Sequence, residues 1–279
     1  MSMIKFQQLI RRRKIPLLET ALVLDKNIYE PNLDIQEWIF VVDDLAEDAL
    51  KVLGPISNKV EGVLNLGEWL FGPDPDGGGF KGNRRQYGDP RNSYMHEVLQ
   101  RRLGIPISLS IIFIEVASRL DLQLSGIGLP GHFVVGGKID GSSFPILLDP
   151  FNNGVRLSMQ DCAALVAQTT GFSGRFEEEW LEPISSKLTI IRVLNNLRVA
   201  YMRVEDWDHS IKVIKHLQLL QPENGSHFRD EGLIHYHLGK FHQASTLLEK
   251  YLELEPNAQD IDLIKRTIGE KMTQWVRLN

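Results

Sequence analysis

Cysteine, long apolar runs and excess basic charge are all scarce in this sequence. Cys162 is the only cysteine among 279 residues, which excludes an internal disulfide and any zinc site built from several thiols. Glu19 and Asp25 interrupt the most apolar N-terminal stretch, so no run reaches the roughly 20 residues that a membrane-spanning helix needs. The formal net charge is −5, whereas a general nucleic-acid-binding protein is basic. We therefore expect no nucleic-acid partner and no membrane insertion.

The remaining composition is that of an ordinary globular protein, for which we expect a cytoplasmic location. Apolar residues make up 43% of the chain and charged residues 24%, and the length suggests about two domains. The N-terminal stretch is basic but has neither an uninterrupted apolar segment nor a small-residue cleavage site, so no signal peptide is predicted. Hydrophobic periodicity divides the chain into a helical region over 1–71, a mixed region over 72–180 and a second helical region over 187–279.

Glycine and proline are concentrated between residues 72 and 92, which indicates a loop. Gly77, Gly79 and Gly82 satisfy the spacing of a nucleotide-binding glycine loop. That mechanism requires a strand before the glycines and a helix N-terminus after them to receive phosphate. Neither signal flanks this stretch, so we reject the nucleotide site and predict no cofactor.

Two helices follow the loop, one polar and one apolar. Asn92 or Ser93 is suited to cap a helix over 93–103, and Gly104 is suited to end it. Pro106 fits the first turn of the second helix, which is apolar on nearly every side. A helix with this pattern must be buried.

Two apolar β segments flank Asp140 and Gly141, a pair typical of a type I′ hairpin turn. If these two residues form the turn, His132 stands directly opposite Asp149, and directly paired side chains lie about 5 Å apart. The sequence therefore predicts a contact between a histidine and a carboxylate. Pro145 cannot donate to the ladder, and a bulge there would shift the register by one residue.

Ser108, His132 and Asp149 occur in the chain order nucleophile, histidine, aspartate. Ser108 lies near the N-terminus of the apolar helix, where amide N–H groups and the helix dipole favour negative charge. In such a triad the histidine accepts the proton of the nucleophile, and the carboxylate orients the imidazole. The simpler alternatives are a first-turn serine that satisfies free amide groups, and a structural histidine–carboxylate pair that stiffens the sheet.

The C-terminal region contains two similar segments, 207–222 and 241–256. They superpose at an offset of 34 residues, with an aromatic residue at each start (Trp207 and Phe241), a small residue three positions on and a proline at each end. This pattern is typical of tetratricopeptide repeats, whose helix pairs bury their faces against their neighbours. We expect a short helical stack, which is either a groove for a protein or peptide partner or a helical cap on the first domain.

Four segments together resemble the transglutaminase-like SirB family, which also carries tetratricopeptide repeats: "YGDPRNSYMHEVLQRR", "GIPISLSIIFIEVASRL", "GLPGHFVV" and "LLDPFNNG". The resemblance covers most of residues 20–165. It implies a papain-like fold in which a buried helix presents a nucleophilic cysteine and a sheet presents a histidine and an aspartate. His132 and Asp149 match the last two positions, whereas Ser108 stands where active members have cysteine. The resemblance alone therefore does not imply an enzyme.

Several other polar residues are candidates for the site. Cys162 follows the histidine and aspartate, the wrong order for the nucleophile of this fold, so we interpret it as a small buried helix residue. Six of the eight histidines lie between His209 and His242, but their spacing does not bring three ligands together, so no metal site is predicted. Three arginines offer carboxylate recognition or are solvated loop charges. The predicted rim of the cleft consists of Arg84, Arg85, Arg91, Asn92, Asn152 and Asn153.

The sequence thus predicts an α+β protein, with a papain- or transglutaminase-like core, N-terminal helices and a C-terminal all-α tetratricopeptide-like stack. The expected function is a protein-interaction or regulatory module that has lost catalysis and that binds a protein or peptide through its repeats and the retained cleft. One alternative is an amide hydrolase or acyltransferase that uses Ser108, His132 and Asp149. Another is a regulatory protein whose pocket binds a small metabolite. The oligomeric state is left open.

Overall fold

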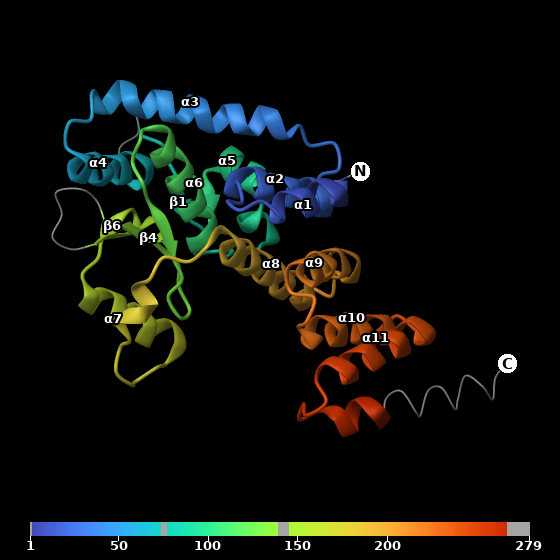
Figure 1. Cartoon of the computed structure of the whole chain (residues 1–279). Coiled ribbons are helices and arrows are strands. Elements are labelled where there is room, and N and C mark those ends of the chain that lie inside the picture. Colours follow the sequence, from blue (N-terminus) through green and yellow to red (C-terminus); the bar gives the residue numbers. More distant parts are fainter. Residues whose placement is uncertain (1, 74–76, 139–144, 267–279) are drawn as a thin grey trace. The chain divides into compact units, whose positions relative to one another are not determined.

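The computed structural model describes residues 2–73, 77–138 and 145–266, and the chain divides into two compact units, residues 1–196 and 197–279 (Figure 1). The helices expected over residues 1–71 belong to the first unit together with the mixed region. The boundary falls inside helix α8 (Ser186–Arg203), ten residues after the expected start of the repeats at residue 187. A single helix therefore contributes to both units.

The first unit combines helices with two small sheets. Its elements before α8 are α1 (Ser2–Ile10), α2 (Leu17–Ile28), α3 (Ile35–Leu53), α4 (Lys59–Phe71), β1 (Lys81–Gly82), the 3-10 helix η1 (Pro90–Ser93), α5 (Met95–Arg101), β2 (Leu103–Gly104), α6 (Pro106–Arg119), β3 (Ser125–Ile127), β4 (Val134–Gly137), β5 (Ile146–Asp149), the 3-10 helix η2 (Pro150–Asn152), β6 (Val155–Arg156), α7 (Met159–Thr170) and the 3-10 helix η3 (Glu178–Leu181). No described helix is long and apolar enough to cross a membrane.

Helix α6 is the buried helix that the apolar pattern predicted. Pro106 occupies its first position, and most of its residues have no contact with solvent. The polar helix before it is shorter than the expected 93–103, because η1 takes up its first residues and Arg102, in the left-handed region with φ 57°, ends α5. Gly104 does not end the helix and lies instead in β2, where a Cβ atom would be 2.7 Å from Ser108 Oγ.

The larger sheet is antiparallel, in the order β3-β4-β5-β6. Asp140 and Gly141, the expected turn, lie outside the described residues. The expected register is wrong by two residues, because Val135 of β4 pairs with Leu148 of β5. Side chains alternate with a period of two along a strand, so a shift by two residues preserves the face on which each side chain lies.

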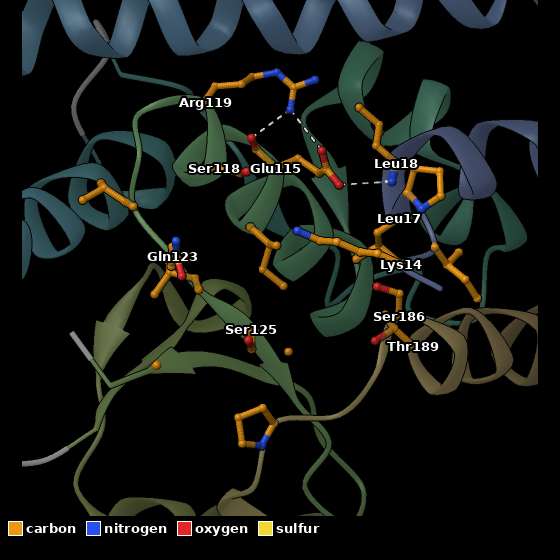
Figure 2. Close-up of a pocket in the computed structure, with 18 of the residues that line it drawn as sticks. Lys14, Leu17, Leu18, Glu115, Ser118, Arg119, Gln123, Ser125, Ser186 and Thr189 are labelled. Carbon is orange, nitrogen blue, oxygen red and sulfur yellow. Dashed lines mark hydrogen bonds and ion pairs between the residues drawn. The ribbon is translucent and has the colours of Figure 1, made fainter. Parts of the chain in front are cut away.

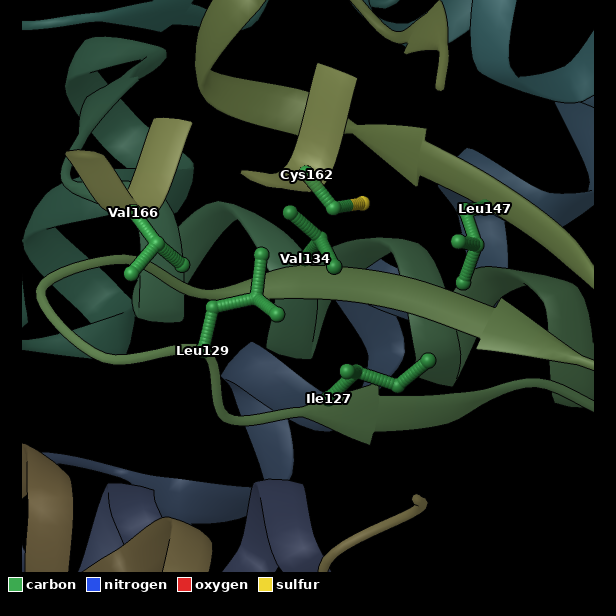
Figure 3. Close-up of a cluster of buried hydrophobic side chains, with 6 residues drawn as sticks. All are labelled: Ile127, Leu129, Val134, Leu147, Cys162 and Val166. Carbon is green, nitrogen blue, oxygen red and sulfur yellow. The ribbon is translucent and has the colours of Figure 1, made fainter. Parts of the chain in front are cut away.

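One face of this sheet packs against α7, as Figure 3 shows. Cys162 and Val166 of α7 meet Val134 of β4 and Leu147 of β5 in a cluster of buried side chains. Leu148 takes part in the packing against α4 and α6, which approach so closely that a Cβ atom at Gly67 would lie 3.0 Å from it. The interpretation of Cys162 as a small buried helix residue agrees with its complete burial.

The second unit consists of α-helices that repeat with the expected period. Helix α9 (Trp207–Leu220) and helix α11 (Phe241–Leu254) begin and end 34 residues apart, and so do the ends of α8 and α10 (Gly225–His237). The equivalent positions Leu217 and Tyr251 are both buried. The predicted pairs of stacked helices are therefore present over the described part of this unit.

Candidate functional site

The predicted contact between histidine and aspartate is present. His132 lies in the turn just before β4, and Asp149 is the last residue of β5. His132 Nε2 is 2.8 Å from Asp149 Oδ2. Asp149 is fully buried and His132 retains 7% of its accessible surface. Because the register is shifted, the two residues meet diagonally across the strands rather than face to face, which is within reach of an imidazole ring.

The carboxylate of Asp149 is held by four hydrogen bonds. Its Oδ1 atom accepts the backbone N–H groups of Phe151 and Asn152, at 3.0 and 3.2 Å. Its Oδ2 atom accepts Asn152 Nδ2 at 2.5 Å, besides its contact with His132. An ionised carboxylate can only accept, so the proton of the neutral imidazole resides on Nε2 and the lone pair on Nδ1. The arrangement thus supplies an oriented base whose Nδ1 atom is the one left for a ligand.

A chain of polar contacts continues from this pair to the surface. Arg84 donates to Asn152 Oδ1 and lies over the ring of Phe151, with its guanidinium carbon 5.0 Å from the ring centroid. The Phe151 ring also contacts the ring of His132, at a centroid distance of 6.3 Å, and that of Tyr87, at 5.8 Å. Two of the residues expected at the rim, Arg84 and Asn152, are therefore linked to the histidine–aspartate pair.

Ser108 does not share a hydrogen bond with His132 in the described structure. Its hydroxyl is fully buried in the first turn of α6. It accepts the backbone N–H of Ile105 at 3.0 Å and donates to the carbonyl of Asn92 at 2.6 Å. This is the capping role that was the simpler explanation of the residue. The bond to Asn92 directs the hydroxyl proton to a backbone carbonyl rather than to an imidazole.

Asn92 does not lie on the rim, which corrects the expectation from sequence. It is fully buried, and its amide nitrogen donates to the carbonyl of Gln86 at 2.7 Å. Its amide oxygen accepts Asn83 Nδ2 at 3.0 Å. The side chain therefore ties the glycine-containing loop to the start of α5. A short exposed polar motif and a buried loop anchor look alike in sequence, because burial depends on distant contacts.

The other rim candidates are exposed. Arg91 forms a bidentate ion pair with Asp89, with Nη2 2.7 Å from Oδ2, so its charge is already used within the loop. Arg85 is exposed on the same loop, and Asn153 is exposed in the left-handed region with φ 61°. Neither takes part in a hydrogen bond to His132 or Asp149 among the described residues. Their place at the rim stays a prediction.

Arg192 of α8 is the residue of this site that sequence reasoning missed. Its guanidinium donates to three carbonyl oxygens of the turn before β4: Gly128 at 3.2 Å, Leu129 at 3.0 Å and His132 at 2.9 Å. Burial lowers the pKa of Arg192, and the nearby hydroxyl of Tyr87 opposes that change. The sequence did contain a signal, since a charged residue stands inside the apolar run of α8.

Replacing Arg192 with methionine is expected to loosen the turn that carries His132. The variant keeps the apolar stem but leaves three partly buried carbonyls without their donor, which should cost about 1–3 kcal/mol of unfolding free energy. Hydrogen exchange should become faster at the amides of residues 128–133. Arg203→Met, at an exposed position of the same helix, serves as the control. Unchanged exchange at 128–133 would show that Arg192 does not hold the turn.

Neither a thiol nucleophile nor a metal is indicated at this site. Burial, together with the carboxylates of Asp161 and Asp149, raises the pKa of the Cys162 thiol to about 11, so the thiol stays protonated at neutral pH. Within residues 2–73, 77–138 and 145–266, no group of three or more His, Cys, Asp or Glu side chains is arranged to hold a metal ion.

Comparison with known proteins agrees with this architecture. Residues 38–195 match the transglutaminase-like superfamily, and residues 197–269 match the tetratricopeptide repeat. The second match begins at the boundary between the two compact units. The resemblance read from the sequence motifs and the repeat period is thus confirmed for both parts of the chain.

Similar proteins extend over most of the chain. The sequence is 32% identical over 254 residues to a UPF0162 protein of Xylella fastidiosa (strain Temecula1), covering 90% of this chain and 88% of that protein. A UPF0162 protein of Vibrio cholerae is 29% identical over 259 residues, or 91% of each chain. The F-box only protein 21 of Mus musculus is 29% identical over 197 residues, which are 66% of this chain but 30% of that protein. No solved structure matches significantly. The chain therefore belongs to the transglutaminase-like superfamily and, within it, to the UPF0162 proteins.

Proposed function

We propose that this chain is a non-catalytic cytoplasmic interaction module, which binds a protein or peptide through its repeats and the retained cleft of its transglutaminase-like domain. The contacts of Ser108 support the absence of catalysis. Serine is a weak nucleophile that needs a well-aligned base, and the Ser108 hydroxyl donates to a backbone carbonyl in a fully buried position. Turning it toward His132 would leave the Ile105 N–H and the Asn92 carbonyl buried without partners, at a cost of about 1–3 kcal/mol for each group.

The observation that carries the proposal is a pair of exposed apolar residues at equivalent positions of the repeats. Val199 of α8 is 62% exposed and Leu233 of α10 is 39% exposed. They lie 34 residues apart, which is the repeat period, so each occupies the same place in its helix pair. Stacked helical repeats use such repeated surface positions for binding. Isolated exposed apolar residues are common, whereas recurrence at the repeat period is what a peptide-binding surface requires.

Site-specific crosslinking tests this surface. A photoreactive phenylalanine derivative at position 233 of the intact chain is expected to capture one defined protein in cells, and the same derivative at the exposed His242 of α11 is not. The double substitution Val199→Glu and Leu233→Glu should weaken binding of the purified partner by at least about tenfold, which corresponds to 1.4 kcal/mol. Arg84→Glu at the rim of the cleft should weaken it as well.

A serine-reactive fluorophosphonate probe separates this function from the hydrolase or acyltransferase alternative. The wild-type chain and Ser108→Ala are expected to remain equally unlabelled. Labelling of the wild type that is lost in both Ser108→Ala and His132→Ala would establish the Ser108, His132 and Asp149 triad and overturn the non-catalytic function. Equal capture from positions 233 and 242, with no effect of the double substitution, would instead remove the repeats as the binding surface.

A further inference from the structure

A cavity of about 830 Å³ lies in the first unit, apart from the histidine–aspartate pair (Figure 2). It is lined by the start of α2, the second half of α6, the edge strand β3 and the start of α8. Neither His132 nor Asp149 contributes to its wall. The volume falls within the range of roughly 300–1,000 Å³ that is usual for small-molecule sites.

The wall of this cavity is apolar over much of its area. Leu17 and Leu18 at the start of α2 are buried, and so are Leu122 and Leu124 in the segment between α6 and β3. Ile114 of α6 and Ile184 before α8 also line it. Ligand pockets combine such a lining with a few polar groups that orient the ligand. The apolar wall therefore suits a ligand with an apolar body.

Each carboxylate in the wall already has a cationic partner. Glu115 Oε2 is 3.0 Å from Arg119 Nη1, and its Oε1 atom accepts the backbone N–H of Leu18 at 3.2 Å. Glu19 pairs with Lys5 at 3.0 Å, and Asp121 pairs with Lys59 at 2.9 Å. The acidic side chains of the wall are therefore not left to bind a cationic ligand.

Lys14 has no such partner. Its side chain extends into the cavity in Figure 2, and it forms no ion pair with any residue that the structure describes. The other lysine of the wall, Lys138, also forms none within the described ranges. The hydroxyls of Ser125 and Ser186 line the same space and can donate hydrogen bonds. The polar groups left for a ligand are thus cationic or hydrogen-bond donors.

We propose that this cavity binds a small amphiphile with an anionic head group and an apolar body. The head group, a carboxylate or a phosphate, pairs with Lys14 and accepts from the serine hydroxyls, and the body lies against the leucine and isoleucine side chains. Charge pairing inside a partly enclosed, apolar site is stronger than at an open surface. The site is separate from the repeat surface proposed above, so a ligand here and a partner on the repeats do not compete for the same residues.

Calorimetric titration of the intact chain with three matched amphiphiles tests the site. Decanoate carries a carboxylate, decyl phosphate a phosphate, and decanol no charge, and all are used below their micelle concentrations. At least one of the two anions is expected to bind at least about tenfold more tightly than decanol, a difference of 1.4 kcal/mol. Which anion binds more tightly identifies the head group.

Two substitutions locate the bound ligand. Lys14→Glu reverses the charge at the exposed Lys14 and should reduce anion affinity by at least about tenfold, or 1.4 kcal/mol. Ser118→Trp fills the cavity from an exposed position of α6 and should abolish binding. Lys265→Glu, at an exposed lysine of the second unit, should have no effect. The site is overturned if neither anion binds, if decanol binds as tightly as both, or if Lys14→Glu and Ser118→Trp bind like the wild type.

Discussion

Replacing Asp25 with alanine is expected to lower the unfolding free energy by about 3–5 kcal/mol, the usual effect of breaking a buried ion pair from one side. Asp25 is 1% exposed within α2, and its Oδ2 atom accepts both the backbone N–H and Nδ1 of His96, at 2.9 and 2.8 Å. Burial raises the pKa of Asp25, whereas its hydrogen bonds and charge interaction with His96 lower it. Removal of the carboxylate leaves His96 unpaired among aromatic rings.

Chemical denaturation of matched variants measures this effect. The rings of Tyr29 and Trp38 lie 5.8 and 5.9 Å from that of His96, so water does not readily replace the lost acceptor. Asp25→Asn keeps the volume and one acceptor atom, and it should be less destabilising than Asp25→Ala. Asp48→Ala, which removes a surface partner of Lys51, should change stability by less than about 0.5 kcal/mol. A loss below about 1 kcal/mol for Asp25→Ala would contradict the assignment, because typical single changes already reach that size.

Acidification from pH 7 to pH 5 is expected to remove about 2 kcal/mol of stability through His216 alone. His216 of α9 is 1% exposed, and its Nδ1 atom is 2.7 Å from the carbonyl oxygen of Lys212. Burial lowers its pKa from 6.5 to about 4. As the pH falls below 6.5 the unfolded chain takes up the proton, but the folded chain does not until about pH 4. The contribution of His216, on the order of 3 kcal/mol in full, is thus present above pH 6.5 and lost as the pH falls toward 4.

Comparison of pH dependence separates this term from a simple loss of packing. The unfolding free energy of His216→Gln or His216→Met should fall less between pH 7 and pH 5 than that of the wild type, by about 2 kcal/mol. Burial also lowers the pKa of His227 and His235, but both residues remain in these variants and cancel in the comparison. His242→Gln, at an exposed position, should behave like the wild type. Identical pH slopes for wild type and both His216 variants would exclude the effect.

Local patterns were sufficient to predict much of the fold. The apolar pattern after Pro106 defined α6, and the offset between Trp207 and Phe241 defined the repeats, because both depend on the geometry of a single helix or helix pair. The hairpin register was wrong by two residues, since the turn was assumed to consist of Asp140 and Gly141 alone. The contact between His132 and Asp149 was still predicted, because the alternation of side chains has the same period of two.

The surroundings of the site could be predicted less well. Asn92 was placed on a rim although it is a buried anchor, because a polar residue after a turn has no local mark of burial. Arg192 is distant in sequence from the turn that it holds, and only its charge within an apolar run hinted at a buried role. The amphiphile cavity left no sequence signal at all, since Lys14, Ser125 and Ser186 come together only through tertiary packing.

The continuity of α8 links two events that have been considered separately. Arg192 and Val199 belong to one uninterrupted helix and are seven residues apart, or about 10 Å along its axis and nearly two full turns. A rigid rod transmits displacement without a hinge, so an occupant that shifts α8 at Val199 also shifts the donor that holds the three carbonyls around His132. Thermodynamic linkage makes such a connection reciprocal. A ligand that reorders the His132 turn would then change the affinity of the repeats by the same factor by which the repeat partner changes affinity at the turn.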